Sequence, residues 1–457
     1  MTYSSDNLAE LPASDGTSAA APARVSPMVW LLIGYMWLFL HRPFEIWTWM
    51  ATIHVERMYM IVTIVCWFLY RPRFPARNRL QRYLGLFTVV MLTSWWLSPY
   101  QAVGDETIEN WLKYAVFYGL LVTSIRTEQD VGALVAGYVA VVTLVMAHSL
   151  REYFCGRSTY AQGIVRLSCV GNTFDANDFA GLIVCCLPFS WVLWRQWTAW
   201  WKRVLLLGHF GLAGCCVMLT GSRMGFIGVI LASMLACLAS PRRWRLLAIY
   251  PVVMAVAWML LPENRQKRYL TLIDSSYGPA SATSSAGNYR LSGFNKALPM
   301  FEERSVLGFG PMSFRAVKGI MPHNLYGQLL AELGTAGAIA FGLLLWGVAR
   351  NTWEARRIVR AVEEWQGGGS VCPSWGESPG MRALYLAWQT VAAAAAAVLL
   401  LAIMGWGFNF LFWHVWLWFG GFQIVALQCL KRQSESLQCE EPIGYGAQDD
   451  IVGAQCD

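Results

Sequence analysis

Residues 384–405 read LYLAWQTVAAAAAAVLLLAIMG, a run of 22 residues without a charged side chain. A helix needs about 20 mostly apolar residues to cross the hydrocarbon core of a bilayer. The whole chain of 457 residues shares this character, with 56% apolar and 14% charged residues, whereas a soluble domain carries about 25% charged residues. The composition therefore predicts an all-α polytopic membrane protein and excludes a cytosolic enzyme, a secreted disulfide scaffold and a nucleic-acid-binding protein.

Twelve segments with this apolar character predict about twelve transmembrane helices. They cover residues 27–46, 53–70, 80–97, 110–125, 131–151, 175–194, 203–220, 223–240, 244–261, 326–348, 384–405 and 408–429. The first 26 residues are rich in Ser, Ala and Pro and lack the basic start and cleavage site of a signal peptide. We expect a disordered tail at residues 1–26 and a second tail at residues 430–457.

The distribution of Lys and Arg orients these helices. If the N-terminus is cytoplasmic, the segments on that side hold 20 of the 35 basic residues, and the short segments on the other side hold seven. Short cytoplasmic loops carry an excess of Lys and Arg, and long loops are left out of the comparison. Both tails are therefore predicted to be cytoplasmic, with helices 1–9 in residues 27–261 and helices 10–12 in residues 326–429.

The loop between helices 9 and 10, residues 262–325, is then predicted to be a large periplasmic domain. Four apolar residues in it recur at near-helical spacing: Tyr289, Phe294, Leu298 and Phe301. This spacing predicts an amphipathic helix over residues 288–303, lying on or dipping into the membrane interface.

Two arginines on the predicted outer side are candidates for phosphate binding. Arg223 lies in the short turn Gly221-Ser222-Arg223-Met224-Gly225, and Arg290 begins the amphipathic helix. A guanidinium group binds phosphate oxygens through two parallel hydrogen bonds. The alternatives are a turn residue that snorkels to solvent for Arg223 and a solvated surface charge for Arg290.

A candidate general base opens helix 10 in the sequence Pro322-His323-Asn324. Proline favours the first position of a helix, which predicts His323 in the first turn at the outer surface. The positive end of the helix dipole favours anions and a neutral imidazole there, as a general base requires. The alternative is an interfacial histidine above a packing face of small residues, made by Gly327, Ala331, Gly334 and Ala338.

Two polar features precede helix 6 on the same side. The stretch from Gly171 to Asp178 contains Asp175 and Asn177, which are candidates either for capping the helix or for binding substrate. Cys155 and Cys169 lie in the short outer loop before it. Because the periplasm permits disulfides, this pair is predicted either to be bridged or to remain as two free thiols.

Several kinds of site are missing from the sequence. No Cys/His cluster has zinc spacing and no Asp-x-Asp pair suggests a divalent metal, so we expect neither a metal nor a cofactor. The ionisable residues predicted to lie inside spans are His209, Glu332 and His414. A proton-coupled transporter usually has more of them.

Three elements of the sequence resemble the O-antigen ligase and polymerase superfamily. The first is Gly308-Phe309-Gly310-Pro311-Met312-Ser313-Phe314, followed by His323-Asn324 and, after nine residues, Gly334-Thr335-Ala336-Gly337. The others are the stretch from Gly171 to Asn177 and the element Ser222-Arg223-Met224-Gly225. The order of about nine spans, a large periplasmic loop and a re-entering His-Asn pair is also similar.

This resemblance implies a metal-independent, inverting glycosyltransferase in a bacterial inner membrane, with its active site facing the periplasm. It implies transfer of a glycan from an undecaprenyl diphosphate carrier to a sugar hydroxyl of lipid A core or another saccharide acceptor. By the same resemblance, Arg223 and Arg290 bind the diphosphate and His323 activates the acceptor. Asn324, Asn177 and Asp175 are the further candidates for substrate binding, and Gly310, Gly327, Gly334 and Gly337 are candidates for a structural role.

The sequence leaves other functions open. A polymerase that joins repeat units uses the same chemistry as a ligase. A twelve-span solute transporter would have paired ionisable groups near the bilayer midplane. A membrane scaffold without activity would have no need of Arg223, Arg290 and His323 on one face.

Overall fold

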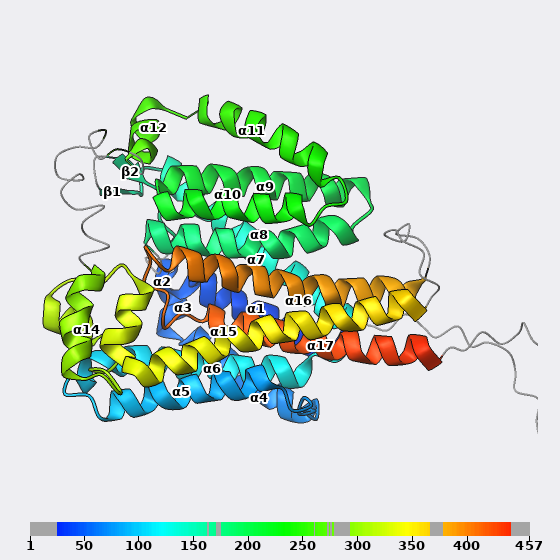
Figure 1. The fold of residues 1–457 in the computed structure, drawn as a ribbon, viewed down its shortest axis with the longest axis horizontal. Coiled ribbons are helices and arrows are strands. Elements are labelled where there is room, and N and C mark those ends of the chain that lie inside the picture. Colours follow the sequence, from blue (N-terminus) through cyan, green and yellow to red (C-terminus); the bar gives the residue numbers. More distant parts are fainter. Residues whose placement is uncertain are drawn as a thin grey trace, which may run out of the picture.

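The computed structural model of this chain describes residues 25–161, 164–170, 175–259, 261–271, 274, 277, 293–365 and 378–439. Figure 1 shows a bundle of helices that run mainly side by side. The elements are α1 (Pro27–His41), α2 (Pro43–Ile46), α3 (Thr48–Thr52), α4 (Val55–Leu69), α5 (Arg79–Trp96), α6 (Gln101–Ser124), α7 (Glu128–Phe154), β1 (Thr159–Ala161), β2 (Ile164–Arg166), α8 (Ala176–Gln196), α9 (Trp200–Thr220), α10 (Arg223–Leu238), α11 (Arg243–Met259), α12 (Glu263–Leu270), α14 (Ser313–Lys318), α15 (Leu325–Trp365), α16 (Pro379–Met404) and α17 (Val415–Cys439). Residues 293–303 are also helical.

The helical character of the chain and its apolar helices confirm the predicted class. Five of the described helices are long and apolar enough to cross a membrane, namely α7, α8, α9, α15 and α16, while α1 and α10 are shorter apolar helices. The count of twelve spans stays a prediction. The strands β1 and β2 form one short antiparallel hairpin, with Thr159 opposite Arg166.

Some predicted segments have different limits from the helices that form, and two of them show why. The segment 27–46 forms two helices, because α1 ends at His41, Arg42 adopts a left-handed conformation (φ 46°) and Pro43 starts α2. The residue before a proline avoids the α conformation, so α1 cannot continue through Arg42. The segment 408–429 begins as a loop, and α17 starts only at Val415.

The core of the bundle is centred on α17, which packs against five other helices, α5, α6, α7, α15 and α16. Its N-terminal half carries some of the largest fully buried side chains, including Trp416, Trp418 and Phe419. A helix that is apolar on all sides is stable only where neighbouring helices cover it. The last of the described helices therefore occupies the centre of the bundle.

The loops divide between two ends of the bundle. We call the end with the β1–β2 hairpin, α12 and α14 the hairpin end, on the left in Figure 1. At the other end, the tail end, the Ser26 amide donates to Asp130 Oδ1 (2.8 Å) and Arg432 Nη1 to the Arg126 carbonyl (2.7 Å). The start of α1 and the end of α17 therefore lie on the same side.

A break in α15 makes room for the chain that precedes it. Gly334 adopts φ 62° and ψ −157°, a conformation that is essentially restricted to glycine. The break frees the amides of Thr335 and Ala336, which donate to the carbonyls of Ser305 (2.8 Å) and Val306 (3.0 Å). The backbone before α14 is thereby held directly against the backbone of α15.

We expect Gly334→Ala to destabilise the protein by more than about 3 kcal/mol. The backbone strain costs about 1–3 kcal/mol, and the added Cβ would lie 2.6 Å from the backbone carbon of Val306, which cannot move aside. Gly342→Ala on the same helix is the control, because its Cβ meets nothing within 4 Å. Thermal unfolding in detergent should separate the two variants, and equal midpoints would contradict this account of the break.

Candidate functional site

Arg223 is positioned by a tight turn between α9 and α10. Gly221 ends α9 in the left-handed conformation (φ 60°), and the Ser222 hydroxyl caps α10 by accepting from the Gly225 amide (3.2 Å). Arg223 is thus the first residue of α10 and is partly buried. Its Nη1 donates to Thr271 Oγ1 (3.0 Å), which follows α12.

Three further arginines gather around the same turn and, with Arg223, form what we call the arginine cluster. Arg166 of β2 donates to the Thr220 carbonyl (2.8 Å), and Arg268 of α12 donates to the Gly221 carbonyl (2.6 Å). Arg265 of α12 donates to the carbonyls of Met218 and Leu219, at 3.0 and 2.8 Å. Carbonyls at the C-terminal end of a helix carry partial negative charge, which explains why the end of α9 attracts cations.

Arg265 is more deeply buried than the other members of the cluster and has four hydrogen-bond partners. It is 5% exposed, and its Nη2 also donates to the Tyr153 hydroxyl (3.1 Å) and the Val165 carbonyl (2.8 Å). Its hydrogen bonds therefore join α12 to α7, α9 and β2. We therefore assign Arg265 a structural role, in which it holds the segments of the arginine cluster together.

The cluster carries a concentration of positive charge. Burial lowers the pKa of Arg268 to about 10, and the charges of Arg166 and Arg223 act in the same direction. Burial also lowers the pKa of Arg166, while the Asp175 carboxylate acts to raise it. In the described part of the chain, none of the ion pairs to Asp or Glu involves Arg166, Arg223 or Arg265. Since a pKa of about 10 keeps Arg268 protonated at neutral pH, a bound anion would stabilise this arrangement.

His323 lies two residues before α15, outside the first turn in which the sequence predicted it. The helix starts at Leu325 because buried Asn324 caps it, with Oδ1 accepting from the Gly327 amide (2.9 Å). His323 itself is partly exposed and has a left-handed backbone (φ 43°). The Asn324 side chain also donates to the Trp406 carbonyl (3.3 Å), and the Leu325 amide to the Gly405 carbonyl (2.7 Å).

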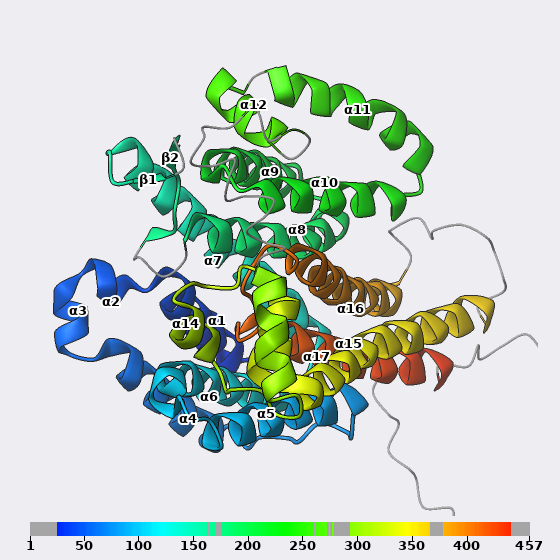
Figure 2. The same cartoon turned by 60° about the vertical axis from the view of Figure 1, so that its left-hand side comes forward.

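The candidate structural glycines Gly310, Gly327 and Gly337 lie at close contacts. An added Cβ on Gly327 would lie 3.2 Å from Phe294 Cα, so the helix of residues 293–303 crosses α15 there. Figure 2 shows this helix in front of the start of α15. Gly310 leaves no space for a Cβ beside Ser98 (2.5 Å), and Gly337 none beside Leu333 of its own helix.

A family comparison covers this part of the molecule. The family model described as O-antigen ligase matches residues 208–342. These residues are similar to that family, and we refer to them as the O-antigen ligase domain. The match confirms the superfamily that the sequence motifs indicate, and a comparison with curated proteins found no match.

The O-antigen ligase domain extends from α9 to the middle of α15. It includes Arg223, Arg268 and His323, whereas Arg166 and the end of α16 lie outside it. The family consists of glycan-processing enzymes that act on lipid-linked glycans. With the apolar helices, the match indicates a multi-pass bacterial membrane protein.

The domain places Arg223 and His323 at the same end of the bundle, because α10 and α15 both start at the hairpin end (Figure 1). The last turn of α16 lies between them. On α10, an added Cβ at Gly228 would lie 2.5 Å from Met404 Sδ, and the next residue, Gly405, accepts from Leu325. The structure thus links the two groups through α16.

The other candidate residues take different places. Asp175 caps α8, its Oδ1 accepting from the amides of Asn177 (2.6 Å) and Asp178 (2.9 Å). The Asn177 side chain accepts from Arg166 Nη2 (2.9 Å), which connects it to the arginine cluster. Arg290 and the first residues of the predicted amphipathic helix lie outside the described residues, and the described part of that helix is residues 293–303.

Arg166, Arg265 and Arg268 are not among the residues that the sequence predicted for the site. Arg265 and Arg268 lie one helical turn apart on α12, a spacing that puts both on one face, and this was an available signal. No local pattern connects Arg166 with them, because β2 is about 100 residues away. Only the fold brings the arginine cluster together.

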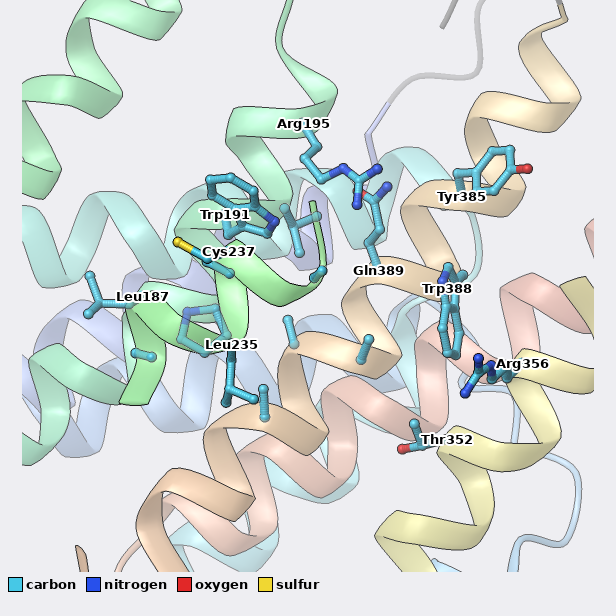
Figure 3. Close-up of a pocket in the computed structure, with 18 of the residues that line it drawn as sticks. Leu187, Trp191, Arg195, Leu235, Cys237, Thr352, Arg356, Tyr385, Trp388 and Gln389 are labelled. Carbon is cyan, nitrogen blue, oxygen red and sulfur yellow. The ribbon is translucent and has the colours of Figure 1, made fainter. Parts of the chain in front are cut away.

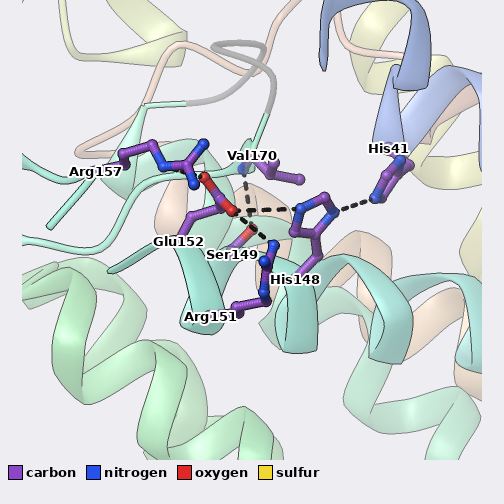
Figure 4. Close-up of polar contacts among 7 residues, drawn as sticks. All are labelled: His41, His148, Ser149, Arg151, Glu152, Arg157 and Val170. Carbon is purple, nitrogen blue, oxygen red and sulfur yellow. Dashed lines mark hydrogen bonds and ion pairs between the residues drawn. The ribbon is translucent and has the colours of Figure 1, made fainter. Parts of the chain in front are cut away.

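A second polar network at the hairpin end was also missed (Figure 4). Nε2 of buried His41 lies 2.8 Å from Nδ1 of His148, and His148 Nε2 lies 3.6 Å from Glu152 Oε1. Glu152 also pairs with Arg157 (2.9 Å) and Arg151 (3.2 Å). The network braces the end of α1 against the end of α7, and the i, i+4 spacing of His148 and Glu152 was its sequence signal.

Both cysteines of the outer loop are free thiols. Cys155 is exposed at the end of α7, and Cys169 is buried. The sequence left open whether Cys155 and Cys169 are bridged, and in the structure they are not. Across the described ranges, we find no group of three His, Cys, Asp or Glu side chains that could hold a metal ion.

Proposed function

We propose that this protein is an O-antigen ligase-type glycosyltransferase at the periplasmic face of the bacterial inner membrane. It moves a glycan from undecaprenyl diphosphate to a sugar hydroxyl of lipid A core or another saccharide acceptor, with inversion and without a metal. The observation that carries this proposal is the arginine cluster at the same end of the bundle as His323, within and beside the O-antigen ligase domain.

The arginine cluster suits a diphosphate. Arg223 follows the turn at Gly221 in the chain, whereas Arg268 and Arg166 donate to the carbonyls of this turn. Guanidinium groups bind phosphate oxygens in pairs of parallel hydrogen bonds, and two or three of them match the oxygens of a diphosphate. Arg290, at the start of the predicted amphipathic helix, is proposed as a further ligand.

His323 suits the role of general base. In the proposed step, its imidazole takes the proton of the acceptor hydroxyl while the acceptor oxygen forms a bond to the anomeric carbon. The bond from that carbon to the diphosphate breaks, and its electron pair leaves on the diphosphate oxygen. The arginine cluster stabilises the charge that develops there. The diphosphate is a good leaving group, so positioning and charge stabilisation supply most of the catalysis.

The arrangement of the two ends supports the proposed sidedness. Segments predicted to be cytoplasmic, such as those around Ser26, Arg126 and Arg432, meet at the tail end. Those predicted to be periplasmic meet at the hairpin end with Arg223 and His323. Substrate carried on a membrane lipid would approach from the bilayer beside the hairpin end.

A deletion strain tests the proposal and separates it from the polymerase alternative, which the family also includes. For a ligase, we expect lipid A-linked polymer to disappear and free lipid-linked polymer to accumulate, since the chain is still built but not transferred. Accumulation of single lipid-linked repeat units would instead indicate a polymerase. Electrophoresis of lipopolysaccharide and of extracted lipid-linked glycan measures both, and an unchanged profile of both would contradict either function.

A further inference from the structure

A large cavity lies far from the proposed active site, towards the tail end. It has a volume of about 920 Å³ and is lined by the C-terminal halves of α8 and α10, the second half of α15 and the middle of α16, with one residue each from α9 and α11. On α10 its lining starts at Ala232, nine residues after Arg223, or about 14 Å along a helix. The cavity is therefore separate from the arginine cluster.

One side of the cavity is apolar and the other is basic. Leu187 and Leu235 line the apolar side, with small residues of α16 such as Ala396. Figure 3 shows Arg195 and Gln389 together at the opposite side from these leucines, with Arg356 beyond Trp388. An apolar interior with a charged margin is suited to an amphiphile.

The length of the cavity matches one leaflet of a bilayer. Along α16 its lining runs from Tyr385 to Ala396, eleven residues or about 16 Å. This is close to half of the hydrocarbon core, which is about 30 Å thick. Both α8 and α16 are long and apolar enough to cross a membrane, so lipid chains would lie next to this cavity.

The charge at the margin favours a negatively charged headgroup. Arg195, Arg356 and Arg360 line the cavity together with one carboxylate, Glu363, which accepts from the Tyr385 hydroxyl (2.7 Å). Among the described ion pairs, none involves Arg356 or Arg360.

Trp191 adds a hydrogen-bond donor to this lining. Its indole Nε1 is buried, and no hydrogen-bond partner contacts it within the described structure. In Figure 3 this nitrogen faces the cavity. An acceptor on a bound molecule, such as an ester or phosphate oxygen, would satisfy it.

We propose that this cavity binds one anionic glycerophospholipid of the surrounding membrane. One acyl chain lies along Leu187, Leu235 and Ala396, and the phosphate lies against Arg356 and Arg360. Basic pockets between membrane helices on the cytoplasmic side are known to hold such headgroups. The inference does not depend on the proposed function, because the cavity lies towards the other end of the bundle.

Native mass spectrometry of the full-length protein in detergent, titrated with phosphatidylglycerol or phosphatidylcholine, tests the proposal. We expect one phosphatidylglycerol to bind at least tenfold more tightly than phosphatidylcholine. Arg356→Gln with Arg360→Gln should weaken its binding about thirtyfold, because two phosphate contacts are lost. Arg357→Gln is the matched control, since Arg357 is on the same helix but lies over the Trp353 ring, 5.4 Å from its centroid, outside the lining.

A second variant tests the acyl chain independently of charge. Ala396→Phe fills the cavity and should remove the bound lipid whatever its headgroup, whereas Leu399→Phe, at an exposed position of α16 outside the lining, should not. Equal binding of the two lipids, or unchanged phosphatidylglycerol binding in both lining variants, would overturn the proposal. Displacement of the lipid by undecaprenyl phosphate at equal concentration would also overturn it, since the site would then belong to an isoprenoid lipid.

Discussion

His323→Asn is expected to reduce glycan transfer by about 10²- to 10⁴-fold, the usual loss when a general base is removed. Asparagine is chosen because His323 has a left-handed backbone (φ 43°), which asparagine adopts at lower cost than alanine. Binding of the lipid-linked donor should be nearly unchanged, since the arginine cluster is intact. The measurement is transfer of a lipid-linked oligosaccharide by purified protein, with donor binding assayed separately.

The chain supplies a matched control for this experiment. His54 is exposed between α3 and α4 and has the same backbone conformation (φ 48°). His54→Asn makes the same chemical change at the same kind of backbone position and should leave transfer intact. Wild-type transfer rates in His323→Asn would remove His323 from the mechanism, even if the protein is a ligase.

Arg223→Ala should weaken donor binding by about 10- to 150-fold, because a hydrogen bond to a charged group contributes about 1.5–3 kcal/mol. Turnover should fall as well, since the leaving diphosphate loses part of its stabilisation. Arg223→Lys should be intermediate, because it keeps the charge but loses the two parallel hydrogen bonds. Donor affinity and transfer rate, each measured at low and high salt, check these expectations.

The control for Arg223 is a charge outside the arginine cluster. Lys267 lies on α12 next to Arg268, is largely exposed and pairs with Glu263 (2.6 Å). Lys267→Ala removes the same charge from the same end of the bundle and should change donor binding less than threefold. An equal loss in both variants would show that net charge alone attracts the donor.

The hydrophobic runs were enough to predict the long helices. Each run that the sequence marks as a span overlaps a helix of the structure, because apolar composition and helical backbone pairing are both local properties. Helix ends were harder to predict where a local contact decides them. Asn324 shows this, since its side chain caps α15 and leaves His323 outside the helix.

The glycines show where sequence motifs carry structural information. Gly334 has a conformation that other residues rarely adopt, and its break is filled by backbone from residues 305–306. The motif identified the residue, but it did not indicate that α15 is broken there. That feature depends on which segment packs against it, which is a long-range property.

The sequence specified the membrane-type class, the approximate helices and the O-antigen ligase superfamily, because each rests on composition or on motifs within a short stretch. The arginine cluster and the lipid-sized cavity could be recognised only in the tertiary structure. Arg166 and Arg268 donate to carbonyls at the end of α9, which carry partial negative charge. Arg223 joins them because it begins α10 directly after the turn that ends α9. Contacts between residues far apart in the chain depend on how helices pack, and periodicity within one helix does not encode them.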